Sequence, residues 1–177
     1  MREVVSLFIV VVALSGCYSK EFHEPGKISI KPMATELVMG GGFQRTWAAT
    51  QAVLAKFAIL QRDIDPSSAR AYLVTDWTKS KSDVLYRGFG EEARIPYTIR
   101  YKLYVYLVAD ASGGTRVTIN SEEQYYDDFI TAGVDPQGSL YSWITTKSST
   151  LKENRLLTEI DKLIRDPEFK ADSQAAR

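Results

Sequence analysis

Residues 95–109 read IPYTIRYKLYVYLVA, and their alternation predicts the longest strand of the protein. One alternate set is mostly apolar: Ile95, Tyr97, Ile99, Tyr101, Leu103, Val105 and Leu107. The other set is more polar and carries tyrosines: Thr98, Arg100, Lys102, Tyr104, Tyr106 and Val108. Since antiparallel sheets commonly bury one face and solvate the other, this pattern predicts an antiparallel sheet with its core on the first set.

The segments around this strand supply the rest of the sheet. Residues 110–114, Asp-Ala-Ser-Gly-Gly, predict a hairpin loop, and residues 115–126 predict the returning partner strand. Residues 70–77 are rich in β-branched and aromatic side chains and predict another strand. Residues 61–68 contain Asp, Pro and Ser and predict a turn-rich link.

Two helices are expected at either end of the domain. The first spans residues 43–60, where Phe43, Trp47 and Leu54 lie on one apolar stripe. The second begins near Thr150, which forms a predicted capping box with Glu153, and stops at residues 166–167, Asp-Pro.

These elements predict an α+β fold. It is a mainly antiparallel sheet with an N-terminal and a long C-terminal helix packed on one face. The expected core residues are Trp47, Leu54, Leu103, Val105, Ile119, Leu157 and Ile160.

The N-terminal sequence predicts where in the cell the protein is located. Residues 4–14 are apolar except for one serine, which suits a secretory signal but is too short for a membrane span of roughly 20 residues. Residues 14–17, Leu-Ser-Gly-Cys, look like a bacterial lipobox, so residues 1–16 are expected to be removed and Cys17 lipidated. The alternative is a short buried strand with a chance cysteine. Tyr18 in place of an aspartate favours the outer membrane, with the protein facing the periplasm.

The boundaries of the mature protein's segments follow from the predicted cleavage before Cys17. Residues 17–42 are expected to form the lipidated cysteine and a tether, residues 43–166 the folded domain, and residues 167–177 a polar tail.

Composition excludes several function classes. The 22 basic and 22 acidic residues cancel, which argues against nucleic-acid binding. A single Cys and a single His, His23 in the tether, leave few routes to a metal site and no Ser-His-Asp or Cys-His arrangement. We therefore expect no enzyme activity, no catalytic residues, no metal and no cofactor. The adjacent carboxylates at residues 91–92, 122–123 and 127–128 are expected to be solvated surface groups.

A series of framework positions suggests a family. It comprises Trp47-Ala48-Ala49, Leu54, Gln61-Arg62-Asp63, residues 71–77, residues 100–105, residues 115–119 and residues 156–160. Over residues 43–164 the chain resembles the helix-grip domain of BamC-type outer-membrane lipoproteins. The resemblance implies a helix-grip-like fold and a role beside a barrel-assembly-like complex. Those relatives are longer, with two such domains and an extended N-terminal segment, and none of their binding motifs matches residues 18–42.

Two functions stay open at this point. The first is a non-catalytic envelope lipoprotein, held to the membrane by its lipid, that docks to a protein complex through Arg100, Lys102, Tyr104 and Tyr106. Tyrosine suits such an interface because it offers a large area at low entropy cost. The second is a module that binds a lipid or small apolar ligand between the sheet and the C-terminal helix. A solvated or covered face is the plain alternative for the four candidate residues, and a filled core would favour docking.

Overall fold

The computed structural model describes residues 32–87, 94–127 and 142–169. The chain divides into two compact units, one formed by Met1–Ile28 with Leu85–Ile95 and the other by Ser29–Val84 with Pro96–Arg177. Few residues of the first unit are described. The predicted signal peptide, Cys17 and His23 all lie outside the described residues.

Seven strands form one sheet in the described part of the chain. They are β1 (Glu36–Met39), β2 (Ile59–Asp65), β3 (Arg70–Thr75), β4 (Thr78–Arg87), β5 (Arg94–Ala109), β6 (Thr115–Asp127) and β7 (Ser142–Thr146). The main order is β1-β6-β5-β3-β2, while β4 pairs with β5 and β7 pairs with β6. The β1–β6, β2–β3, β3–β5, β5–β6 and β6–β7 pairs are all antiparallel. This confirms the predicted α+β class with a mainly antiparallel sheet.

The β5–β6 hairpin sets which side chains share a face. Its register pairs Ala109 with Thr115 at the loop and Arg100 with Gln124 farther along. Gly113 has a φ of 83°, which a glycine adopts without steric penalty, and it donates its backbone N–H to the carbonyl of Asp110. The Asp110 carboxylate accepts hydrogen bonds from the backbone and hydroxyl of Ser112. The predicted loop at residues 110–114 is therefore confirmed.

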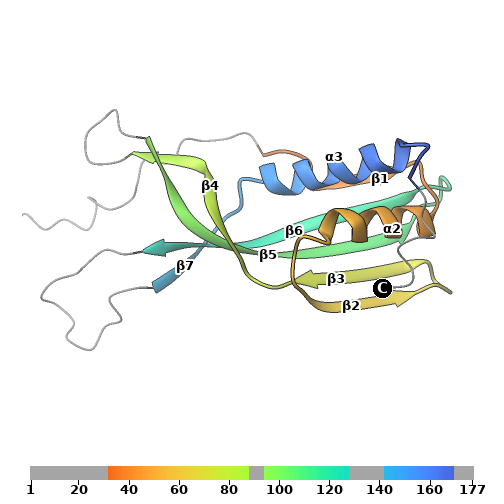
Figure 1. Cartoon of the computed structure of the whole chain (residues 1–177), viewed down its shortest axis with the longest axis horizontal. Helices are drawn as coiled ribbons and strands as arrows, with labels where there is room; N and C mark the ends of the chain where they lie inside the picture. Colours follow the sequence, from red (N-terminus) through yellow and green to blue (C-terminus); the bar gives the residue numbers. More distant parts are fainter. Residues whose placement is uncertain (1–31, 88–93, 128–141, 170–177) are drawn as a thin grey trace, which may run out of the picture. The chain divides into compact units, whose positions relative to one another are not determined.

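Two helices contribute to a single hydrophobic core. Helix α2 (Phe43–Leu54) and helix α3 (Leu151–Arg165) contact each other and lie side by side in Figure 1. One cluster of buried residues draws on both helices and on β1, β3, β5 and β6. All the predicted core residues belong to it: Trp47, Leu54, Leu103, Val105, Ile119, Leu157 and Ile160.

The structure departs from prediction at the weakly patterned strands. Helix α2 ends at Leu54 rather than at residue 60, because residues 59–65, largely expected to be a link, form β2. Strand β2 is mostly exposed and polar, so it carries little periodic signal, and its pairing with β3 decides its conformation. Strand β1 lies inside the stretch expected to be a tether, and only Met39 of its four residues is buried.

The predicted capping box at α3 is wrong. Thr150 has a left-handed backbone, with φ of 64°, and its side chain makes no capping hydrogen bond. Its hydroxyl oxygen instead accepts a hydrogen bond from the backbone N–H of Met33 at 2.6 Å. The Glu153 carboxylate accepts from the hydroxyl of Ser121 on β6. Both side chains that a local cap would have used therefore form hydrogen bonds with residues outside the helix.

Candidate functional site

Strand β5 directs the four candidate residues away from the hydrophobic core. We call their side of the sheet the outer face: it carries Arg100, Lys102, Tyr104 and Tyr106 of β5. The intervening residues Leu103, Val105 and Leu107 are fully buried on the other side. Tyr106 is 42% exposed. The predicted alternation of the strand is therefore confirmed, and it gathers all four candidates on one face.

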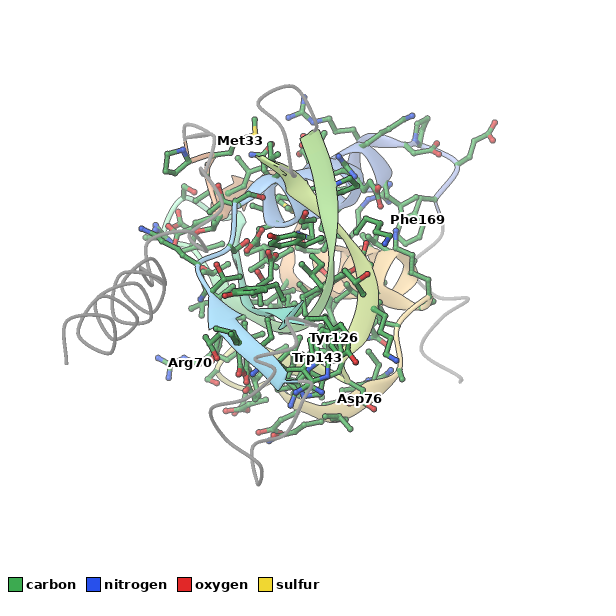
Figure 2. All side chains as sticks on the ribbon, turned by 90° about the vertical axis from the view of Figure 1, so that its left-hand side faces the viewer. Met33, Arg70, Asp76, Tyr126, Trp143 and Phe169 are labelled. Carbon is green, nitrogen blue, oxygen red and sulfur yellow. The ribbon has the colours of Figure 1, made fainter. Side chains whose placement is uncertain are left out.

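Arg100 contacts two indole rings on the outer face. Its Cζ lies 4.6 Å from the ring centroid of Trp77, in the link between β3 and β4, and 4.5 Å from that of Trp143 on β7. Its Nε donates a hydrogen bond of 2.8 Å to Oε1 of Gln124, the residue opposite on β6. Trp143 packs in turn against Tyr126, with ring centroids 5.2 Å apart (Figure 2). Two rings and one acceptor thus define the position of the guanidinium.

Lys102 lies next to Arg100 on the outer face and shares one of its rings. Its Nζ is 5.0 Å from the centroid of Trp77. Within the described ranges, no carboxylate forms an ion pair with Arg100 or Lys102. Glu122 is the cross-strand neighbour of Lys102, but its Oε2 accepts a hydrogen bond of 3.1 Å from the hydroxyl of Tyr104. We call Arg100 and Lys102 the outer cation pair.

The two candidate tyrosines have different partners. Desolvation, and then the hydrogen bond to Glu122, raise the pKa of Tyr104, so its hydroxyl stays a donor at neutral pH. Tyr106 packs against Tyr72 of β3, with centroids 4.7 Å apart and an angle of 32° between the rings. The rings of Tyr72 and Tyr106 extend the aromatic surface along the sheet from the outer cation pair.

A second charged group lies on the opposite side of the same strands. Lys152, in the first turn of α3, places its Nζ 2.8 Å from Glu123 of β6 and 2.9 Å from Asp83 of β4. The Nζ also lies 5.5 Å from the ring centroid of Tyr101. Glu153 is 1% exposed, and its Oε2 has no hydrogen-bond partner among the described residues. We call Asp83, Glu123, Lys152 and Glu153 the inner charge cluster.

Electrostatics keep Lys152 charged. Burial by itself would lower the pKa of Lys152, but the hydrogen bonds and negative charges of Glu123 and Asp83 outweigh it. The pKa of Lys152 therefore lies above its ordinary value. The inner charge cluster is an ion-paired group that links α3 to β4 and β6.

The prediction that residues 122 and 123 are solvated is wrong for Glu123. Glu123 is 4% exposed and ion-paired, while Glu122 lies on the outer face. Strand alternation separates the two carboxylates, as expected, but α3 covers one of them with a lysine. A pattern in one strand cannot reveal what another element brings to it.

Sequence reasoning missed the aromatic half of the outer face. The sequence predicts a strand that ends at Trp77 and no element at Trp143, and it gives neither residue a role. The hairpin register could have placed Gln124 opposite Arg100 and Glu122 opposite Lys102, because the predicted loop determines every pair beyond it. The sequence also contains a pattern that could have identified the inner charge cluster. Lys152 lies four residues before Leu156 and Glu153 four before Leu157, on the buried stripe of α3.

A comparison with protein-family models and with curated protein sequences finds no match to this chain. Within the described ranges, no helix has the length and apolar character needed to cross a membrane. The same residues contain no group of three or more His, Cys, Asp and Glu side chains arranged to hold a metal ion.

Proposed function

We propose that this protein is a non-catalytic bacterial envelope lipoprotein, an accessory subunit that docks to an outer-membrane complex. Cys17 carries the lipid anchor, and the domain faces the periplasm. The fold is helix-grip-like, with both helices over one face of the sheet, as in BamC-type lipoproteins. The lipobox at residues 14–17 and the framework positions of the sequence support this proposal.

The observation that carries the docking role is the composition of the outer face. Aromatic rings from four strands and a link share this face with the two cations Arg100 and Lys102: they are Tyr72, Trp77, Tyr104, Tyr106, Tyr126 and Trp143. Tyr, Trp and Arg are the residues most enriched among those that dominate binding energy at protein interfaces. Their arrangement supports a protein-docking surface better than a merely solvated one.

The alternative, an apolar ligand between the sheet and α3, gains no support from this region. The first turn of α3 places Lys152 and Glu153 against Glu123 and Ser121 there. Farther along the helix, Leu157 and Ile160 are buried in the same cluster as Leu103 and Val105. Charged groups at one end and packed side chains at the other are poor surroundings for a lipid chain.

The anchor is tested by metabolic labelling with a fatty acid. The wild-type chain should incorporate the label, and Cys17→Ser should accumulate as unlabelled precursor. Label retained in the variant would contradict lipidation at Cys17.

The docking role is tested with a C-terminally tagged full chain purified from membranes in mild detergent. Tyr104→Ser with Tyr106→Ser should leave the protein folded and release the partner recovered with the wild type. A matched control, Arg155→Gln with Lys162→Gln, changes two exposed residues of α3 and should retain the partner. Equal recovery by all three proteins would contradict docking through the outer face.

A further inference from the structure

The outer cation pair is an unusual feature for a surface without a ligand. Exposed lysines and arginines can be hydrated singly, but here two lie on adjacent same-face positions of one strand. No described carboxylate pairs with either, although Glu122 is the direct neighbour of Lys102. The hydroxyl of Tyr104 binds Glu122 instead. Among the described residues, no ion pair compensates the positive charge of the pair.

The geometry of Arg100 restricts which group could bind to the pair. The indole rings of Trp77 and Trp143 lie close to the guanidinium, and its Nε–H already donates a hydrogen bond to Gln124. Its terminal N–H groups have no hydrogen-bond partner among the described residues and act in the plane of the guanidinium. A carboxylate matches this geometry because its two oxygens accept two parallel hydrogen bonds in one plane.

The surrounding charges favour one carboxylate over a polyanion. The registers place Asp63 and Asp65 of β2 on the outer face with Glu122. Two exposed arginines lie there as well, Arg70 and Arg116, and Arg116 is already ion-paired. A nucleic-acid strand crossing this face would bring successive phosphates against these acids. A single acidic side chain with apolar or aromatic neighbours would meet only the cations and the rings.

We propose that the outer cation pair is the receptor for a glutamate or aspartate side chain on an acidic, aromatic-containing segment of the partner protein. Arg100 binds the carboxylate through its two terminal nitrogens, and Lys102 adds a second charge beside it. Tyr72 and Tyr106 pack against the side chains that flank the acid. This inference rests on the proposed docking function and names the chemistry of the partner.

Two capped peptides test the proposal: Gly-Tyr-Glu-Tyr-Gly and its matched control, Gly-Tyr-Gln-Tyr-Gly. The readout is the indole N–H signals of the three tryptophans in the ¹⁵N-labelled full chain in non-ionic detergent. Trp77→Phe and Trp143→Phe assign two of them, and Trp47, buried in the core, serves as the reference.

The glutamate peptide should shift the signals of Trp77 and Trp143 but not that of Trp47. A charge-assisted hydrogen-bond pair contributes about 1.5–3 kcal/mol, so the glutamine peptide should bind at least about tenfold more weakly. Arg100→Gln should weaken binding of the glutamate peptide most, because it removes both the charge and the fork. Arg100→Lys should weaken it less but clearly, because lysine keeps the charge without the planar fork. Arg155→Gln should not change the affinity. Binding should also weaken as salt is added.

Equal affinity for the two peptides, or full binding by Arg100→Lys, would overturn the carboxylate receptor. Tighter binding of single-stranded oligothymidine than of the glutamate peptide at the same salt concentration would overturn it as well.

These results are distinct from failure of the docking function. If Tyr104→Ser with Tyr106→Ser releases the partner while the peptides bind equally, docking stands and the acidic recognition element is wrong. If Arg100→Gln weakens binding of the glutamate peptide but Tyr104→Ser with Tyr106→Ser still recovers the partner, the carboxylate receptor is supported. The proposal that the partner docks on the outer face is then wrong.

Discussion

Two cationic centres lie on opposite faces of the β5–β6 hairpin, and they are stabilised in different ways. Inside, Lys152 is buried and paired with two carboxylates, Glu123 and Asp83. Outside, Arg100 and Lys102 are partly exposed and lie against indole rings, with no described acid paired to them. The two centres are built on neighbouring residues: Glu123 lies inside and Gln124 outside.

The difference follows from solvent. A charge removed from water must be paired, since an isolated buried charge is destabilising by several kcal/mol. A charge that keeps part of its hydration needs no partner for the fold to be stable. The inner charge cluster is thus a requirement of folding, whereas the outer cation pair stays available for binding.

The largest effect should come from removing the inner cation. Lys152→Met leaves the buried carboxylate of Glu123 and the half-buried carboxylate of Asp83 without their cation, so it should lower the free energy of unfolding by about 3–5 kcal/mol. Chemical denaturation of the full chain measures this. The control Lys162→Met, at an exposed position of the same helix, should change stability by no more than about 0.5 kcal/mol. A decrease in the free energy of unfolding of less than about 1 kcal/mol in Lys152→Met would contradict the proposed difference between the inner charge cluster and the outer cation pair.

The outer face should respond more weakly to the same measurement. Arg100→Gln removes two cation–π contacts, each worth roughly 0.5–1 kcal/mol at partly exposed sites, so the total loss should be about 1–2 kcal/mol. A loss equal to that of Lys152→Met would make Arg100 a structural residue and would leave the two centres alike.

The smallest effect should come from the loop that sets the register of both faces. Hydrogen bonds from Ser112, and then from Arg116, lower the pKa of Asp110 to about 2 from 3.8. A lowered folded-state pKa stabilises the protein above pH 3.8, and this contribution is lost as the pH falls toward 2. Asp110→Asn should therefore lower the Tm slightly at pH 7 and leave it equal to that of the wild type near pH 2. Asp63→Asn, at an exposed position of β2, is the matched control for the loss of one surface carboxylate.

The sequence predicted the parts of this molecule whose pattern is local and strong. The alternation of β5, the loop at residues 110–114 and the apolar stripe through Trp47 and Leu54 each identified their element and its buried side. The two centres depend on pairs of elements far apart in the chain. No local pattern brings Trp143 to Arg100, since β7 reaches it only by pairing with β6.

The same limit explains the errors at β2 and at the start of α3. Residues 59–65 are mostly exposed and four of the seven are polar, so the pairing with β3, rather than the composition of the segment, determines the strand. The Thr150 and Glu153 side chains fit a local capping box, but Met33 and Ser121 bind them in the folded chain. Where two arrangements satisfy the same side chains, the one with more tertiary contacts is stabilised.

We propose that the outer face, and not helix α3, is where the protein meets its partner. Site-specific photo-crosslinking in intact cells tests it directly, with p-benzoylphenylalanine in place of Tyr106 on the outer face or of Arg155 on α3. We expect a discrete covalent adduct with another envelope protein from position 106 and none from position 155. An adduct from position 155 with none from position 106 would contradict it.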